Sequence, residues 1–350
     1  MSLVAHISRS ALEHNLRALS DRSAPAAVMF VVKANGYGHG AVDVAAIAHG
    51  VGIRHFGCLE IETALSVRAV VPDPSVQLLA WQFSERDDLS VVAANGIDLG
   101  VGSTDLLDVI ERAHVDGTDP IRVHLKVDTG LNRNGVPQNE WAPFVERVVD
   151  MDERGIVTAV GIWTHIAETS DEADIRAREQ FETARNVAES ALGRTLFAHL
   201  AASSASFRLP DFRFDAVRIG GHAYGIPSFD DVTPADMGLR PVMTLTADAT
   251  ADHDEEWGDV TSVNGGFADG VPGYAAGLVS LTVEGVRHPI AAVLEDEIIA
   301  TGRPAGTRAY LFGDGSHGEQ TVREWGDAMG TLGDEITCRI SPLVPRVIAF

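Results

Sequence analysis

The chain has 350 residues, of which 45% are hydrophobic and 22% charged; 27 Lys and Arg against 50 Asp and Glu give a formal net charge of −23. This length suits one large barrel or two domains, and the composition is typical of a globular protein with a buried core. The excess of acidic residues excludes extended binding to nucleic-acid phosphates, which requires clustered Lys and Arg. Two cysteines, Cys58 and Cys338, are too few for a disulfide framework and lack metal-ligand spacing. No apolar run reaches the roughly 20 residues of a membrane helix, and the N-terminus lacks a signal-peptide core. We therefore expect a cytoplasmic protein that binds neither nucleic acid nor membrane.

The first two thirds of the chain alternate short apolar runs with longer amphipathic segments. The runs are rich in β-branched residues, which predicts strands at residues 4–7, 27–32, 55–60, 76–81, 97–101, 122–127, 160–165, 197–202 and 216–221. Helices are expected at residues 10–20, 104–114, 140–153 and 172–192, with N-caps at Ser103 and Ser170. After the first strand, eight strands alternate with helices. This pattern predicts an α/β (β/α)₈ barrel like that of triosephosphate isomerase, with a doubly wound sheet as the alternative.

The sequence pattern changes after about residue 235. Short strand-like runs at residues 241–249, 279–284, 290–292, 298–300 and 308–311 are separated by Gly and Asp, with one helix candidate at 321–329. This pattern predicts an all-β domain. We expect a barrel domain at residues 1–232, a linker within 225–237, and a C-terminal β domain at 233–350. The first strand belongs to either domain.

A lysine ends the first predicted barrel strand. The segment from Val31 to Gly40 reads VVKANGYGHG, so a buried apolar run stops at Lys33 and continues into a glycine-rich loop. Barrel enzymes keep their chemistry at this end of the strands. A lysine beside a dry strand interior has a lowered pKa, and the neutral amine is the form that makes Schiff bases. A lysine that only extends into solvent is the alternative.

This decapeptide resembles the pyridoxal-phosphate attachment motif of the alanine racemases, which are fold-type III enzymes. The resemblance implies that Lys33 holds pyridoxal 5'-phosphate and that Tyr37 contacts its phosphate. It continues in order along nearly the whole chain, in HLKVDTGLNR (124–133), GIWTH (161–165), HLAASS (199–204) and VRIGGHAYG (217–225).

Each of these segments implies a site residue. By resemblance, Lys126 is a candidate carbamylated lysine, Arg133 lies near a cofactor oxygen, and His165 packs on the cofactor ring and contacts Arg218. Catalytic roles are implied for Lys33, Arg133 and His165. Cofactor binding is implied for Lys33, Tyr37, His165, Ser203, Arg218, Gly220, Gly221 and Tyr224. No metal site is expected. Asn132 and Ala202 stand where the family usually has glycine and asparagine.

Two of these inferences also follow from general chemistry. Ser203, Gly220 and Gly221 come after the seventh and eighth barrel strands, where barrels commonly hold phosphate, and glycine amides there form an anion site. The resemblance implies that Arg218 faces the pyridine nitrogen, and chemistry gives the consequence. Because an arginine stays protonated, it leaves that nitrogen unprotonated and weakens the electron sink, which favours simple proton removal and return at Cα.

The resemblance fails at the second catalytic base. In the family a tyrosine from the partner subunit serves the opposite face of the substrate, and the matching segment here has Phe267, which cannot transfer a proton. Tyr274, His165, a water or Lys33 itself are the candidate replacements. The segment Glu295–Asp296–Glu297 lacks the family's methionine, and the segment that begins at Gly333 lacks its tyrosine.

The sequence thus predicts a racemase that interconverts L- and D-alanine through a Schiff base on Lys33. One alternative is a related pyridoxal-phosphate enzyme with another amino-acid substrate or one-sided Cα chemistry. A non-catalytic cofactor-binding protein is the other. The resemblance implies a homodimer with active sites at the interface, a small amino-acid substrate and a place in D-alanine biosynthesis.

Overall fold

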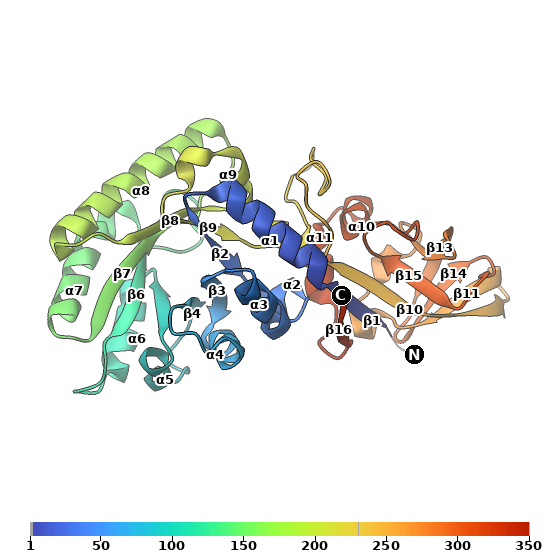
Figure 1. Cartoon of the computed structure of the whole chain (residues 1–350), viewed down its shortest axis with the longest axis horizontal. Helices are drawn as coiled ribbons and strands as arrows, with labels where there is room; N and C mark the ends of the chain where they lie inside the picture. Colours follow the sequence, from blue (N-terminus) through green and yellow to red (C-terminus); the bar gives the residue numbers. More distant parts are fainter. Residues whose placement is uncertain (1–2, 230, 350) are drawn as a thin grey trace. The chain divides into compact units, whose positions relative to one another are not determined.

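Eight parallel strands close a barrel in the computed structural model, which describes residues 3–229 and 231–349 (Figure 1). The strands are β2 (Ala27–Val31), β3 (His55–Glu60), β4 (Gln77–Gln82), β5 (Ile97–Val101), β6 (Ile121–Lys126), β7 (Val157–Trp163), β8 (Phe197–Ala202) and β9 (Ala216–Ile219). β2 and β9 pair in parallel, with Met29 opposite Arg218, and this pairing closes the ring. The predicted (β/α)₈ barrel is confirmed, and the doubly wound alternative is wrong.

Helices lie outside the barrel strands (Figure 1). They include α4 (Ile61–Val70), α5 (Ser90–Ala94), α6 (Thr104–Ala113), α7 (Trp141–Glu153), α8 (Asp171–Leu192) and α9 (Ser203–Arg208). Both predicted N-caps are confirmed, because the hydroxyls of Ser103 and Ser170 accept hydrogen bonds from Leu106 N and Ala173 N. The strand expected at 160–165 begins three residues earlier, since Val157 pairs with Ile121 of β6, and it ends at Trp163.

Glycines on the barrel strands make room for indole rings. A Cβ added at Gly100 would lie 2.6 Å from Trp81 Cβ and 3.2 Å from Trp163 Cζ2, and one added at Gly57 would lie 3.0 Å from Trp81 Cζ3. Protein interiors are close-packed, so a methyl group at either position would displace a ring. The aromatic packing of the barrel therefore depends on these two glycines.

The remaining strands form an eight-stranded sheet in the order β11-β14-β13-β12-β15-β10-β1-β16, and β10 also pairs with β11. They are β1 (Val4–Ser8), β10 (Met243–Asp254), β11 (Gly258–Asn264), β12 (Ser280–Val283), β13 (Val286–Val293), β14 (Glu297–Thr301), β15 (Arg308–Phe312) and β16 (Arg346–Ala349). β1 pairs antiparallel with β10 and parallel with β16, so the first predicted strand belongs to this sheet. The predicted C-terminal all-β fold is confirmed. The helix expected at 321–329 is α10 (Val322–Met329), and α11 (Gly333–Arg339) is an addition.

The chain divides into two compact units that do not follow chain order. Residues 19–33 and 52–220 form what we call the barrel unit. Residues 3–18 and 34–51, together with the described residues after 220, form the β unit. The chain crosses from one unit to the other within helix α1 (Arg9–Ser23) and again in the short left-handed turn labelled α2 (Lys33–Tyr37), and helix α3 (Ala41–Gly50) lies in the β unit. The described residues of the expected linker form turns and irregular structure, and its residue 230 lies outside the described residues. The domain boundary at 232/233 stays a prediction.

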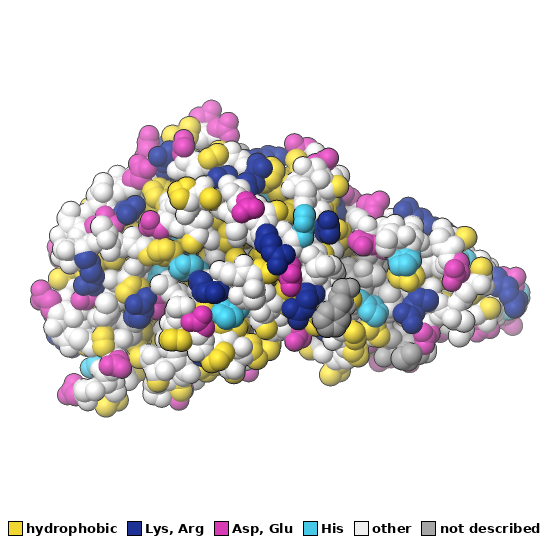
Figure 2. All heavy atoms as spheres, viewed as in Figure 1, with side chains coloured by type: hydrophobic (Ala, Val, Ile, Leu, Met, Phe, Trp, Pro, Cys, Tyr) yellow, Lys and Arg dark blue, Asp and Glu magenta, His cyan; other side chains and the backbone are white. Residues whose placement is uncertain are grey.

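On the face drawn in Figure 2, Lys and Arg side chains are distributed among Asp and Glu side chains. Across residues 3–229 and 231–349, no helix is both long enough and apolar enough to cross a membrane.

Candidate active site

The chain has only two lysines, and both lie at the carboxyl ends of barrel strands. Lys33 follows β2, whose ladder continues to Val32, because the Val32 N–H donates to the Gly57 carbonyl at 2.9 Å. Lys126 is the last residue of β6. Barrel enzymes carry their chemistry at this end, where the βα loops converge. The scarcity of lysine among 27 basic residues is a sequence signal that the motif-based prediction did not use.

Lys126 is buried in a polar and aromatic environment. Its Nζ donates to Asn134 Oδ1 and lies 4.2 Å from the centroid of the Trp163 ring. Both side chains line a cavity of about 320 Å³ in the barrel unit. Burial, followed by the charges of Arg218 and Arg133, lowers the pKa of Lys126 to about 7. A large fraction of this amine is therefore neutral at neutral pH.

Arg133 is exposed on the segment after β6, and its charge acts on Lys126, His165 and Arg218. The neighbouring Asn132 has φ of 55°, in the left-handed region. Asparagine adopts this region more readily than most residues, which explains why it can stand where glycine is usual in the family.

Arg218 is buried on β9 among hydrogen-bond acceptors. Its NH1 donates to the His199 carbonyl at 2.8 Å and to His199 Nδ1 at 3.1 Å. Its NH2 donates to the carbonyls of Thr164 and Leu200, at 2.7 and 2.8 Å, and to His165 Nδ1 at 3.2 Å. The predicted contact between His165 and Arg218 is therefore present, and the guanidinium is held by two imidazoles.

Positive charge accumulates around His165. Burial, and then the charges of Arg218, Arg133, Lys126 and Lys33, lower the pKa of His165 to about 3. Burial, and then Arg133, lower the pKa of Arg218 to about 9, although Glu168 opposes this shift. His165 is consequently a neutral imidazole at physiological pH. An anionic ligand would relieve the repulsion among these basic groups.

Ser203 and Gly220 meet at the ends of β8 and β9. The Gly220 N–H donates to Ser203 Oγ at 3.0 Å, which leaves the serine O–H available for another acceptor. Ser203 is the first residue of α9. The chain then enters the β unit at Gly221, which begins the short 3₁₀ helix η3 (Gly221–Tyr224).

The loop that follows Lys33 belongs to the β unit and has an unusual backbone. Ala34, Asn35, Gly36 and Tyr37 have φ between 51° and 63°, all in the left-handed region. Each non-glycine residue there costs about 1–2 kcal/mol, so tertiary contacts must hold the loop. The Asn35 side chain accepts a hydrogen bond from Ala41 N at 3.0 Å.

Tyr37 is fixed by packing inside the β unit. Its ring centroid lies 5.2 Å from that of Tyr224, and the His39 ring lies 4.5 Å from Tyr224. Burial, and then the charges of Asp334 and Cys338, raise the pKa of Tyr37. The phenol therefore stays protonated and can only act as a neutral hydrogen-bonding group.

Phe267 begins the short 3₁₀ helix η4 (Phe267–Asp269) and is 55% exposed. Its N–H donates to the Leu294 carbonyl at 2.9 Å, and a Cβ on Gly266 would lie 2.2 Å from the same oxygen. The backbone turn is thus fixed while the phenyl ring faces solvent in this chain. Tyr274, on η5 (Gly273–Ala275), is also exposed and acts electrostatically on Arg339.

The predicted site residues fall into two groups. Lys33, Lys126, Arg133, His165, Ser203, Arg218 and Gly220 belong to the barrel unit, and Tyr37, Gly221, Tyr224 and Phe267 belong to the β unit. Within the barrel unit the structure joins His165 to Arg218 and Ser203 to Gly220 by hydrogen bonds. Sequence reasoning missed His199 as a partner of Arg218, although it lies in the HLAASS segment.

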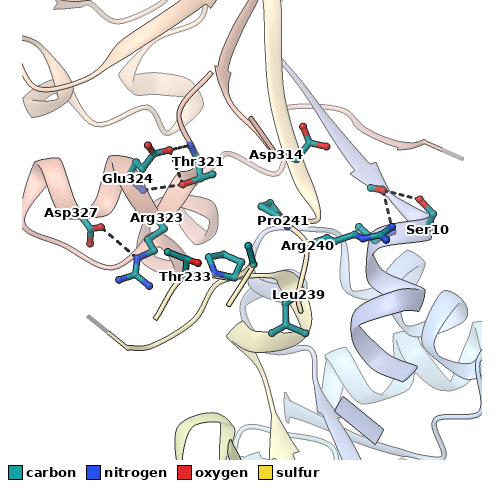
Figure 3. Close-up of a pocket in the computed structure, with 14 residues that line it drawn as sticks. Ser10, Thr233, Leu239, Arg240, Pro241, Asp314, Thr321, Arg323, Glu324 and Asp327 are labelled. Atoms are coloured by element: carbon teal, nitrogen blue, oxygen red, sulfur yellow. Dashed lines mark hydrogen bonds and ion pairs between the residues drawn. The ribbon is translucent and has the colours of Figure 1, made fainter. Parts of the chain in front are cut away.

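A second cavity, of about 720 Å³, lies within the β unit (Figure 3). Its lining includes Arg240, Arg323, Asp314 and Glu324 and contains none of the predicted site residues. Arg323 forms an ion pair with Asp327 at 3.5 Å. In the part of the chain that the structure describes, no group of three or more His, Cys, Asp or Glu side chains could hold a metal ion.

Comparisons with known proteins identify the same family over nearly the whole length of the chain. The family model for the N-terminal domain of alanine racemase matches residues 7–228, and the model for its C-terminal domain matches 247–348. The alanine racemase of Thermobifida fusca is 36% identical over 98% of this chain and 97% of that protein, and the one from Streptomyces coelicolor is 34% identical over 98% and 95%. The crystal structure of alanine racemase from D-cycloserine-producing Streptomyces lavendulae superimposes with a TM-score of 0.91 at 30% identity, covering 100% of this chain and 97% of that one. The chain belongs to the alanine racemase family.

Proposed function

We propose that this protein is an isomerase that interconverts L- and D-alanine with pyridoxal phosphate as its cofactor. The observation that carries the proposal is the placement of Arg218. This residue lies on β9 and donates hydrogen bonds to His165 and His199. β9 pairs with β2, and Lys33 lies at the end of β2. Relatives named alanine racemase match 98% of the chain, which supports the same activity. A changed substrate or a non-catalytic role is not favoured, because the match extends through both domains.

The donors of the barrel unit fit an anionic phosphate ester. Four basic side chains act on the single imidazole of His165, and one acidic side chain, Glu168, acts on Arg218. We assign phosphate binding to the hydroxyl of Ser203 and the backbone amide of Gly221, with Tyr37 and Tyr224 as further contacts. The Gly220 amide, which we expected to bind the phosphate itself, instead donates to Ser203 Oγ and positions it. Ser203 supports this role because its oxygen accepts from Gly220 while its own proton stays available.

When bound, pyridoxal phosphate supplies an electron sink conjugated to the substrate Cα. Lys33 holds the cofactor and, as an amine, accepts and returns the Cα proton on one face of the substrate. Arg218 donates toward the ring nitrogen and does not surrender its own proton, so the nitrogen stays unprotonated and the sink is weak. A weak sink favours return of the proton to Cα, which is racemisation, over transamination.

Arg133 and Lys126 complete the proposed barrel site. Arg133 supplies a positive charge near a cofactor oxygen, and Lys126 is the candidate for carbamylation. Its pKa of about 7 supports that candidacy, because the neutral amine is the form that reacts with carbon dioxide. The Asn134 side chain holds Lys126 Nζ in place.

The second base must come from a group other than Phe267, which has no exchangeable proton. His165 is a poor candidate because its pKa of about 3 makes it a weak proton acceptor. Tyr274 has a phenol, is half exposed and lies in the electrostatic field of Arg339. A water molecule and Lys33 itself are the other candidates.

A homodimer is part of the proposal. Phe267, Tyr274 and Leu294 of the β unit are 55%, 48% and 44% exposed. A backbone hydrogen bond joins Phe267 and Leu294, so two of these exposed residues belong to adjacent segments. Exposed apolar groups of this kind mark interaction surfaces. The partner's β domain would complete each active site, in a cytoplasmic enzyme of D-alanine biosynthesis.

The test is chiral chromatography of L-alanine after incubation with the cofactor-loaded protein. We expect D-alanine to appear. Borohydride reduction should then fix the cofactor to one lysine peptide, and because the chain has only two lysines, mass spectrometry separates Lys33 from Lys126 without ambiguity. Lys33→Ala should lose the fixed cofactor and the activity, whereas Lys126→Arg should retain the fixed cofactor.

Cofactor fixed on Lys33 without D-alanine would refute the racemase and favour another amino-acid substrate. Cofactor fixed elsewhere, or retained in Lys33→Ala, would refute the assignment of Lys33.

A further inference from the structure

A chain of hydrogen bonds crosses the interior of the barrel and ends on Arg218. Arg122 donates to Asp98 through Nε, at 2.7 Å to Oδ1, and through NH2, at 3.2 Å to Oδ2. Asp98 Oδ2 lies 3.1 Å from His124 Nε2, and His124 Nδ1 lies 2.9 Å from His199 Nε2. His199 Nδ1 lies 3.1 Å from Arg218 NH1. The four inner side chains are at most 4% exposed and come from β5, β6, β8 and β9.

The chemistry of the two ends fixes the direction of every bond. A guanidinium can only donate, so His199 Nδ1 must accept and its proton must be on Nε2. His199 Nε2 then donates to His124 Nδ1, and His124 Nε2 donates to the carboxylate of Asp98. A carboxylate can only accept, so the opposite end requires the same order. Each imidazole therefore has one permitted tautomer.

The charge states support this order. Burial, and then the charge of Arg218, lower the pKa of His199 far below its usual value, so the ring is neutral. Burial of Asp98 alone would favour the acid, but hydrogen bonds from His124 and Arg122 outweigh it and hold the pKa of Asp98 below its usual value. The carboxylate is thus ionised, and its two oxygens accept from both neighbours.

Gly161 provides the space for the hydrogen bond between His124 and His199. A Cβ added at Gly161 of β7 would lie 2.2 Å from His124 Nδ1, the atom that bonds to His199. Gly161 does not have a positive φ, so its backbone does not require glycine. The space is needed for the imidazole ring, which indicates that the interior is shaped around the His124–His199 bond.

We propose that Asp98 is a positioning residue for Arg218: through His124 and His199 it fixes the tautomers so that a nitrogen lone pair, and not an N–H, faces the guanidinium. Among residues 3–229 and 231–349, no carboxylate accepts a hydrogen bond from Arg218, so its orientation depends on such neutral acceptors. Reversed tautomers would turn His199 Nδ1–H toward a donor-only group and break the bond. The consequence for catalysis rests on the proposed function, in which Arg218 faces the ring nitrogen of the cofactor.

The test begins with cofactor-free protein. Nitrogen-15 shifts of labelled imidazoles distinguish protonated from unprotonated ring nitrogens, and single His→Gln variants assign the two resonances. We expect Nε2–H tautomers for His124 and His199 in the wild type. Asp98→Asn, which can donate through its amide, should introduce Nδ1–H forms of both rings. Arg122→Lys keeps a cation beside the carboxylate and should leave both tautomers unchanged.

Kinetics and absorption of the holoenzyme then show whether the hydrogen-bond chain from Asp98 through His124 and His199, which we call the relay, acts on Arg218. Asp98→Asn should lower kcat by about 10- to 100-fold with little change in KM, as for other residues that orient a functional group, and should shift the pH dependence of the bound cofactor's visible absorption. Gly161→Ala, which changes no charge, should lower kcat in the same sense by displacing His124, and it serves where Asp98→Asn does not fold.

Tautomers that are the same in Asp98→Asn and wild type would overturn the proposal. Shifted tautomers with unchanged kcat and unchanged absorption would overturn the positioning role. Shifted tautomers in a protein whose wild type does not racemise alanine would instead show that the proposed function fails while the relay stands.

Discussion

Gly38→Ala tests how the loop after Lys33 is held. Gly38 has φ of 82°, and a Cβ there would lie 1.9 Å from the carbonyl oxygen of Thr337 and 2.7 Å from its carbon. Ordinary contact begins at 3.4 Å, so the backbones must separate by about 1.5 Å. Because the obstacle is backbone, rotation of a side chain cannot relieve it.

The expected cost has two parts. The left-handed conformation costs about 1–2 kcal/mol for alanine, and forcing apart packed atoms costs about 1–3 kcal/mol more. Gly277→Ala is a matched control in the same unit, since its φ is 77° and no atom lies within 4 Å of the added Cβ. Gly277→Ala should lose only the stability that corresponds to the left-handed conformation, about 1–2 kcal/mol.

Denaturant unfolding followed by circular dichroism measures both variants in the absence of cofactor. Gly38→Ala should be less stable than Gly277→Ala by about 1–3 kcal/mol. It should also bind pyridoxal phosphate more weakly, because the displaced loop carries Tyr37, whereas Gly277→Ala should bind normally. Equal stabilities within about 0.5 kcal/mol would refute the argument that the Thr337 carbonyl confines this loop.

Three further substitutions, one of them with a matched control, test the proposed site. Phe267→Tyr should raise kcat by about 10²- to 10⁴-fold if the absent hydroxyl limits proton transfer, and Tyr274→Phe in the wild type should abolish activity if that phenol is the present base. No gain in the first and no loss in the second would exclude both positions. Ser203→Ala should weaken cofactor binding by about 10- to 150-fold, the value of a hydrogen bond to a charged group, as measured by equilibrium titration. Ser204→Ala is its control, because the Ser204 hydroxyl donates to Glu168, and equal affinities of the two variants would contradict the assignment of Ser203.

Local pattern predicted most barrel strands closely. The bounds of β3, β5 and β8 agree with the expected ranges, since these buried strands are mostly apolar and end at polar or glycine residues. Helices α3 and α4 were not predicted because they consist largely of small and apolar residues, so their amphipathic period is weak. The strand expected at 241–249 ends five residues before β10 does, and β11 was not predicted, because residues 251–259 are mostly polar and largely exposed, a pattern typical of loops.

The sequence by itself determined the alternation that makes a barrel, the motifs that resemble one family, and the exposed or apolar character of most segments. These follow from properties of neighbouring residues: hydrophobic period, turn chemistry and the identity of a few reactive side chains. Only the tertiary structure decided that β1 joins the sheet of β10 and β16, that Gly38 lies against Thr337, and that Asp98 connects to Arg218 through two imidazoles. Each of these contacts joins residues far apart in the chain. Pairing and hydrogen-bond direction at such distances depend on which strands become neighbours when the barrel closes, and no local pattern records that.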